Sequence, residues 1–206
     1  MRSSTARARG VRRRRWTSAE FASLDFETTG LDLVNDHVVS FGVVPIRAGR
    51  IVLGEGIHQL VEPPIPPSPS SVTIHGMRTQ DLLGSPTIAD ATDALAGALA
   101  HRYLLTWYST LELAILGRMF GRKGRGFSRR CIDVRKIALV VGGGEVSASF
   151  ANSLTRCATH YGVPVAAPHE AFDDALVTAQ LFLVLTSRLR SDGGVPTVRD
   201  LLLAGR

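Results

Sequence analysis

Two acidic residues separated by one position follow an apolar run near the amino terminus of the chain. Asp25 and Glu27 end the stretch that begins at Phe21, and two threonines and a glycine come directly after them. Since side chains alternate between the two faces of a strand, both carboxylates point the same way, with Cα atoms about 6.5–7 Å apart. Two carboxylates this close repel each other unless a cation lies between them or one takes a proton. The pair therefore predicts a metal site, and an exposed acidic strand tip is the plain alternative.

Two further carboxylates and a histidine occur in places where side chains can turn inward. Glu112 stands between Leu111 and Leu113 on a predicted helix, where it either enters the core or simply opens the helix. Asp174 shares a helical face with apolar residues at i+3, i+7 and i+11, so we expect it to face the core. His169 precedes that helix, where a loop can place it over a site, although a surface histidine is the simpler interpretation.

Together these residues form a set with a specific chemistry. Asp25, Glu27, Glu112 and Asp174 offer only oxygen ligands, which suit Mg²⁺ or Mn²⁺. Four acids can hold two such ions about 3.5–4 Å apart, the arrangement that cleaves phosphodiesters in line. A histidine such as His169 can then take the proton of the attacking water near neutral pH.

Basic residues are concentrated at the amino terminus of the 206-residue chain. The net charge is +6, and the arginines among the first fifteen residues contribute +7 without any acid, so the remainder carries −1. The sequence therefore predicts a basic, disordered tail over residues 1–18 that could bind phosphate backbones, followed by one domain over residues 19–206. A solvated extension without a function is the alternative.

The remaining composition is typical of a globular protein. Apolar residues make up 45% of the chain, and no apolar run is long enough to cross a bilayer. Cys131 and Cys157 are too few for a disulfide scaffold, so we expect two small buried hydrophobes in a reducing cytoplasm. These features predict a cytoplasmic protein with no membrane partner.

The elements that position the acidic residues are predicted from hydrophobic periodicity and turn residues. Three consecutive strands suggest an antiparallel meander, and alternating helices and strands follow a proline-rich loop at 62–70. This order predicts an α/β fold with a mixed sheet flanked by helices. The predicted strands are 21–26, 38–46, 50–61, 103–108 and 130–134, and the main predicted helices are 87–100, 111–120, 150–161 and 172–190.

The candidate residues occur in motifs that resemble those of the DEDDh 3′–5′ exonuclease family, which includes epsilon-subunit-like and RNase T-like proteins. The first motif, D-F-E-T-T-G-L, runs from Asp25 to Leu31, and the third, H-x-A-x-x-D, runs from His169 to Asp174. Three shorter segments are also similar to family segments: I-H-G at 74–76, C-I-D at 131–133, and S-L followed by G-V-P between 153 and 164. The resemblance covers residues 22–185.

The second family motif differs in this chain. The usual H-N-x-x-F-D reads W-Y-S-T-L-E at 107–112, so Glu112 replaces an aspartate and the His-Asn pair is missing. Glutamate keeps the charge but adds a methylene, which puts the metal geometry and the catalytic rate in question. Asp133, at the end of the next strand, is the fallback for this ligand.

The resemblance implies a ribonuclease H-like fold with a mixed five-stranded sheet in the order 3-2-1-4-5. It also implies a metal-dependent exonuclease that releases nucleoside 5′-monophosphates from 3′ ends. Two Mg²⁺ or Mn²⁺ ions would be held by the four carboxylates, and His169 would be the general base. The terminal nucleotide would be bound by residues of the first motif and by a second histidine: Thr28, Thr29, Gly30, Leu31 and His75.

Single-stranded or frayed DNA is the substrate we expect, in repair or replication, with a polymerase or repair protein as a candidate partner. An exoribonuclease of the RNase T or oligoribonuclease type is the first alternative, since the sequence does not separate DNA from RNA. A non-catalytic nucleic-acid- or polymerase-binding module is the other alternative, and the altered second motif is the feature that supports it. The retained acids and His169 favour an enzyme, and the short segment 191–206 favours one that works alone.

Overall fold

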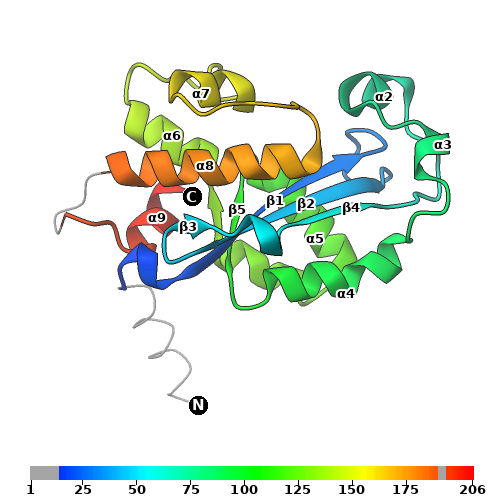
Figure 1. Cartoon of the computed structure of the whole chain (residues 1–206), viewed down its shortest axis with the longest axis horizontal. Coiled ribbons are helices and arrows are strands. Elements are labelled where there is room, and N and C mark those ends of the chain that lie inside the picture. The colour runs from blue at the N-terminus through cyan, green and yellow to red at the C-terminus, as the bar shows by residue number, and fades with distance from the viewer. Residues whose placement is uncertain (1–13, 190–193) are drawn as a thin grey trace, which may run out of the picture.

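A mixed sheet forms the middle layer of the computed structural model, which describes residues 14–189 and 194–206 (Figure 1). Its strands follow the order β3-β2-β1-β5-β6, with β4 also paired to β2. The β1–β2 pairing is antiparallel, whereas β1–β5 and β5–β6 are parallel. The strands are β1 (Glu20–Thr28), β2 (Val38–Arg47), β3 (Arg50–Ile51), β4 (Ile57–Leu60), β5 (Tyr103–Thr106) and β6 (Cys131–Asp133). The predicted order 3-2-1-4-5 is confirmed, with β3 and β4 as two pieces of the third strand.

The prediction of one continuous strand over 50–61 is wrong, because a short 3-10 helix, η2 (Leu53–Glu55), interrupts it. The Glu55 carboxylate accepts hydrogen bonds from both terminal nitrogens of Arg47, at 2.9 and 2.8 Å, and this pairing holds the turn against β2. Gly56 follows, and a Cβ there would meet the ring of Phe172. The break therefore makes room for an aromatic side chain from the opposite layer.

Helices cover both faces of the sheet (Figure 1). The longest helix, α8, lies across one face with α6 and α7 beyond it, whereas α4 and α5 lie against the other face. The helices are α2 (Pro69–His75), α3 (Thr79–Leu82), α4 (Ile88–Leu99), α5 (Ser109–Phe120), α6 (Val134–Gly142), α7 (Leu154–His160), α8 (Ala171–Arg188) and α9 (Val198–Ala204), with 3-10 helices η1 (Trp16–Ser18) and η3 (Gly124–Arg129).

Three helical details differ from the sequence-based expectation. His75, expected in a loop, is the last residue of α2, and Gly76 ends that helix in the left-handed conformation. The helix predicted over 150–161 begins only at Leu154, because the Ser153 side chain caps it. Helix α9 was not predicted, since it is short and follows a glycine- and proline-containing segment. None of the helices in the described part of the chain has the length and apolar character needed to cross a membrane.

Alternation along β1 divides the core into two parts. Phe21 packs toward α8, where its ring centroid lies 5.0 Å from that of Phe182. Leu24 and Phe26 belong to the apolar cluster on the α4 and α5 side. Asp25, one residue out of phase with them, therefore lies on the α8 face. The two cysteines are free and buried in these clusters, as predicted.

Segments near the two ends of the described chain, around Trp16 and Pro196, lie together. The indole of Trp16 packs edge-on against Phe182 at a centroid distance of 5.7 Å, and its backbone N–H donates to the carbonyl of Pro196 at 3.2 Å. Trp16 therefore packs against the core, although it precedes the predicted domain boundary at residue 19. Residues 1–13 of the predicted tail lie outside the described residues.

Helix α8 crosses β2 at a glycine. A Cβ on Gly42 would overlap backbone atoms of Ala171 and Phe172, the first residues of that helix. Backbone atoms cannot rotate away, so only glycine permits this approach. Gly42 is also the partner of Asp25 in the β1–β2 ladder. The crossing therefore places the start of α8 directly over the acidic part of β1.

We predict that Gly42→Ala destabilises the protein by about 1–3 kcal/mol, because the added methyl group forces α8 away from the sheet. The measurement is urea unfolding of the purified protein. Gly97→Ala in α4 is the matched control, since a Cβ there meets nothing within 4 Å. The same added atom should stabilise the control by about 0.5–1 kcal/mol through helix propensity. Equal effects of the two substitutions would contradict the close crossing.

Candidate active site

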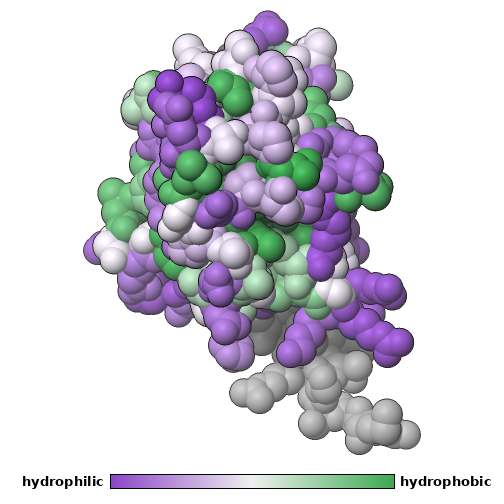
Figure 2. Space-filling model, turned by 90° about the vertical axis from the view of Figure 1, so that its right-hand side faces the viewer, coloured by the Kyte–Doolittle hydropathy of each residue, from purple (hydrophilic) through white to green (hydrophobic). Residues whose placement is uncertain are grey.

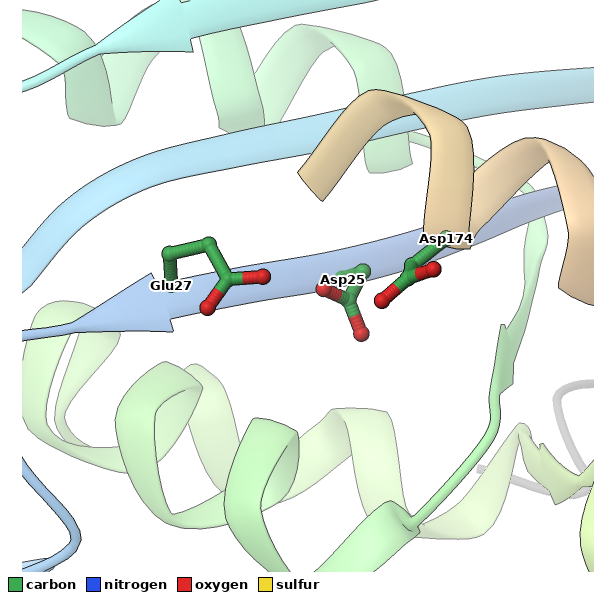
Figure 3. A group of neighbouring side chains, drawn as sticks. All are labelled: Asp25, Glu27 and Asp174. Atoms are coloured by element: carbon green, nitrogen blue, oxygen red, sulfur yellow. The ribbon is translucent and has the colours of Figure 1, made fainter. Parts of the chain in front are cut away.

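Three carboxylates converge between β1 and the first turn of α8. Asp25 and Glu27 project from the same face of β1, and Asp174 projects toward them from α8 (Figure 3). One oxygen of each lies within 4.8 Å of the others. The structure therefore brings together three of the four acids that the sequence singled out, and the spacing suits a shared cation.

The start of α8 is built to hold Asp174 in this place. Glu170 caps the helix, accepting a hydrogen bond from the backbone N–H of Asp173 at 3.1 Å. The backbone N–H of His169 donates to a carboxylate oxygen of Asp174 at 3.2 Å. The cap and this contact fix the direction in which the Asp174 side chain leaves the helix.

Glu112 is the fourth acid, and it is buried in the first turn of α5 with only 2% of its surface exposed. Its Oε2 atom has no hydrogen-bond partner among the described residues. After burial itself, the charge of Glu112 is the largest cause that raises the pKa of Asp25. An unpartnered buried carboxylate whose charge acts on Asp25 fits a cation-binding role better than a helix-opening one.

The fallback ligand, Asp133, is occupied elsewhere. It caps α6 by accepting from the backbone N–H of Lys136 at 3.1 Å, and its other oxygen accepts from the N–H and hydroxyl of Ser109 at 3.2 and 3.0 Å. Both oxygens hold neighbouring segments together. Glu112 therefore remains the better candidate for the fourth ligand.

The electrostatics of the cluster favour protons or a cation. Burial raises the pKa of Glu27 to about 8, with further increases from Asp174 and Glu170. Burial likewise raises the pKa of Glu112 to about 8 and that of Asp25 well above its usual range. The pKa of Asp174 is also raised by burial, and the N–H of His169 partly opposes that increase. At neutral pH the cluster therefore retains protons that a divalent ion would displace.

His169 lies exposed at the rim, directly before the cap of α8. Its backbone φ of +67° is uncommon for a residue with a side chain, and such conformations often occur at functional positions. Its charge acts on both Asp174 and His75, so the residue lies near both. A base near the acids is needed to take the proton of an attacking water.

His75 closes the opposite side of the rim. The backbone N–H of Met77 donates to Nδ1 at 3.1 Å, so Nε2 carries the proton and contacts the carbonyl of Thr28 at 3.3 Å. Burial is the main cause that lowers the pKa of His75, and the nearby His169 adds to it. A neutral His75 thus ties α2 to the end of β1.

The loop after β1 is shaped by its own side chains. Thr29 is buried, and its hydroxyl donates to Asp36 at 2.7 Å and accepts from the N–H of His37 at 3.0 Å. The hydroxyl of Thr28 donates to the carbonyl of Gly30, and a Cβ on Gly30 would overlap the Asp36 carboxylate. These contacts show that the T-T-G part of the first motif holds the loop in its conformation.

Leu31 differs from these residues, because 83% of its side-chain surface is exposed. It belongs to the end of the molecule that carries α2 and α3, where Figure 2 shows apolar residues scattered among hydrophilic ones. Ile74 and Leu83 are exposed as well. Leu31 and Ile74 flank the loop and α2, and are free to contact a ligand.

Two features of the site were missed by sequence reasoning. A glycine inside the β2 strand pattern was the available signal for Gly42, since such a residue often marks a close backbone approach. The second feature is the contact of His58 with Glu170, at 3.0 Å between Nε2 and Oε1. No sequence signal links His58, which belongs to β4, to the start of α8.

Comparison with known sequences gives one consistent result. The family model RNase_T, described as Exonuclease, matches residues 23–182. A PolC-type DNA polymerase III of Thermotoga petrophila is 29% identical over 85% of this chain and 12% of its own length. An epsilon-like protein of DNA polymerase III from Rhodobacter capsulatus is 30% identical over 84% of this chain and 24% of its own length. The chain thus spans a quarter or less of the length of these relatives.

Solved structures show the same fold at lower identity. Escherichia coli exonuclease I in complex with a dT13 oligonucleotide superposes with a TM-score of 0.70 and 16% identity, over 82% of this chain and 41% of that one. The nuclease domain of 3′hExo, a DEDDh member bound to rAMP, gives 0.67 and 19%, over 81% of this chain and 90% of that one. The ribonuclease H-like fold predicted from the sequence is therefore confirmed.

Repulsion within the cluster leads to a prediction about pH and metal. Glu27 and Glu112 hold protons up to about pH 8 in the folded state and release them near pH 4.5 when unfolded. The unfolded state binds fewer protons between these values, so the stability of the metal-free protein falls as pH rises through that window. Mn²⁺ should therefore raise the melting temperature more at about pH 8.5 than at about pH 6.

The variant Glu112→Gln tests the same point. It removes a buried charge, so the metal-free variant should melt at a higher temperature than wild type at about pH 8.5 and lose part of the Mn²⁺ effect. Asp200→Asn is the control, because it alters an acid that caps α9 and does not act on the four acids, so its Mn²⁺ effect should remain. Differential scanning fluorimetry after chelation supplies both comparisons. A Mn²⁺ effect that is independent of pH would argue against the cluster as the binding site.

Proposed function

The chain belongs to the DEDDh family of 3′–5′ exonucleases (RNase_T), and we propose that its substrate is the 3′ end of single-stranded or frayed DNA. Each cycle would hydrolyse one phosphodiester bond and release a nucleoside 5′-monophosphate. The observation that carries the proposal is the convergence of Asp25, Glu27 and Asp174, and the unpartnered carboxylate of Glu112, whose charge acts on Asp25, supports it. A binding module that had lost catalysis would have no need to keep these mutually repelling carboxylates close together.

The four carboxylates fit two Mg²⁺ or Mn²⁺ ions. Their donors are all oxygen, and the orphaned Oε2 of Glu112 lacks any other partner among the described residues. When bound there, the ions would neutralise charge on the phosphate and lower the pKa of water. The added methylene of Glu112 is accommodated in this chain, since its side chain is buried toward Asp25.

The remaining roles belong to the rim. His169 takes the proton of the attacking water, because it lies exposed beside Asp174, to which its backbone N–H donates, and is not needed as a ligand. His75 and the exposed Leu31 contact the terminal nucleotide. Thr28, Thr29 and Gly30 support that contact by holding the loop in shape.

An exoribonuclease is the alternative that a specific observation favours, since the 3′hExo nuclease domain was solved with rAMP bound. Relatives also include the epsilon subunit of DNA polymerase III in Salmonella typhimurium, 23% identical over 79% of this chain and 70% of its own length. A polymerase or repair protein is therefore the partner class we propose for this chain. Side-by-side digestion of 5′-labelled DNA and RNA oligomers with Mg²⁺ or Mn²⁺ separates the two substrates.

His169→Ala tests the mechanism. The substitution should lower kcat about 10²–10⁴-fold, the usual contribution of a general base, and leave the Mn²⁺-induced rise in melting temperature in place. His101→Ala is the matched control, because His101 is also exposed with a positive φ, of 61°, but lies before β5 at the other end of the sheet. The control should retain wild-type turnover.

Two outcomes would oppose the proposal. Full activity of His169→Ala would show that the histidine is only a surface residue and that another group takes the proton. Absence of turnover by the wild-type protein on every DNA and RNA end would favour a binding module instead.

A further inference from the structure

An aromatic ring and an arginine stack at the edge of the sheet that carries the acidic cluster, and the ring belongs to the segment where this chain departs from the second family motif. The guanidinium of Arg135 lies 4.6 Å from the centroid of the Tyr108 ring. Nearly half of the Tyr108 surface, 47%, remains exposed. The pair therefore offers one solvent-facing ring and one cation with unused donors.

The fold places this pair next to the acids. Tyr108 is the residue directly before α5, and the first turn of that helix carries Glu112. Arg135 belongs to the first turn of α6, which follows β6 directly. The contacts of Ser109 with Asp133 hold the ends of β5 and β6 together, and β5 is the parallel neighbour of β1. The pair thus lies at the same edge of the sheet as the acidic cluster.

A second pair of the same kind continues from the first. Arg135 donates to the side-chain carbonyl of Asn152 at 2.8 Å. Phe150 lies two residues before Asn152, and the guanidinium of Arg156 lies over its ring, 5.0 Å from the ring centroid. An open hollow of about 370 Å³ adjoins this second pair, lined by Phe150, Thr155, Arg156, Thr159 and His160.

Neither arginine is neutralised by a carboxylate. Other arginines of the described chain, such as Arg47 and Arg102, form ion pairs with glutamates, whereas Arg135 and Arg156 have none there. Between residues 134 and 169 the sequence contains one acid, Glu145. Cations alternating with aromatic rings are the features by which proteins bind single-stranded nucleic acid.

We propose that Tyr108, Arg135, Asn152, Phe150 and Arg156 form a track that guides single-stranded nucleic acid into the active site. Bases stack on the exposed parts of the two rings, and the arginines contact phosphates. The proposal rests on the exonuclease function proposed above and adds to it a binding site for the nucleotides that precede the 3′-terminal one.

The test measures binding separately from hydrolysis. Fluorescence anisotropy with labelled oligothymidylates in EDTA compares wild type with the double variant Arg135→Met/Arg156→Met, in the full chain. Affinity for oligomers of about twelve nucleotides should fall at least tenfold, and the slope of log K against log salt should decrease by about 1.4, or about 0.7 for each phosphate contact. The loss should be small for a dinucleotide, which is too short to reach the second pair.

The chain offers a matched control. Arg130 and Arg188 also lie over aromatic rings, at 4.6 Å from Phe127 and 4.9 Å from Tyr161, but outside the track. The double variant Arg130→Met/Arg188→Met removes the same charge and should bind within twofold of wild type. Equal losses in the two double variants would overturn the track, because diffuse charge would then explain binding.

A second variant covers the case in which Arg135→Met disturbs folding. Tyr108→Leu combined with Arg156→Gln changes two exposed positions, and one lost stacking contact alone should weaken binding about fivefold to 100-fold. Unchanged affinity of this folded variant would also overturn the proposal. Turnover of the p-nitrophenyl ester of thymidine 5′-monophosphate by wild type with Mn²⁺ reports on the proposed function alone, so its failure is distinct from failure of the track.

Discussion

The site depends on one close approach between a helix and a strand. Helix α8 can place Asp174 over β1 only because Gly42 leaves no side chain between the β2 backbone and the helix start. The same crossing seats Phe172 against Gly56 and brings Glu170 to His58. The packing on this face of the sheet therefore sets the distance between Asp174 on α8 and the acids of β1, two elements that are remote in sequence.

This arrangement brings mutually repelling carboxylates close to Asp25 in an otherwise well-packed molecule. Burial and the charges of Glu112, Glu27 and Asp174 raise the pKa of Asp25, and no lysine or arginine is among the described groups that act on it. Structural carboxylates elsewhere are handled differently, since Asp133 and Asp36 accept several hydrogen bonds each. Within the described part of the chain, such a concentration of raised carboxyl pKa values is what is expected of a functional centre.

Much of the site was predictable from local rules. Alternation along one strand placed Asp25 and Glu27 on one face, and helical spacing turned Asp174 inward. The role of Glu112 was not decidable locally, because a helix-opening acid and a buried ligand have the same sequence signature. Only the tertiary structure shows its unpartnered oxygen and the occupied oxygens of Asp133. The 3-10 helix η2 after β3 could not be predicted from the sequence either, since it depends on the Phe172 side chain of α8, which packs against Gly56.

The two terminal segments of the described chain end at different places on the sheet. Trp16 lies beside Pro196 at the start of β1, whereas the acids lie toward the far end of that strand. The chain then returns along α9, and the carbonyl of Gly205 accepts from the backbone N–H of Asp133 at 3.1 Å, where β6 ends. A polypeptide fused after Arg206 would therefore start beside the edge of the sheet that carries the acids, whereas Trp16 lies at the opposite edge.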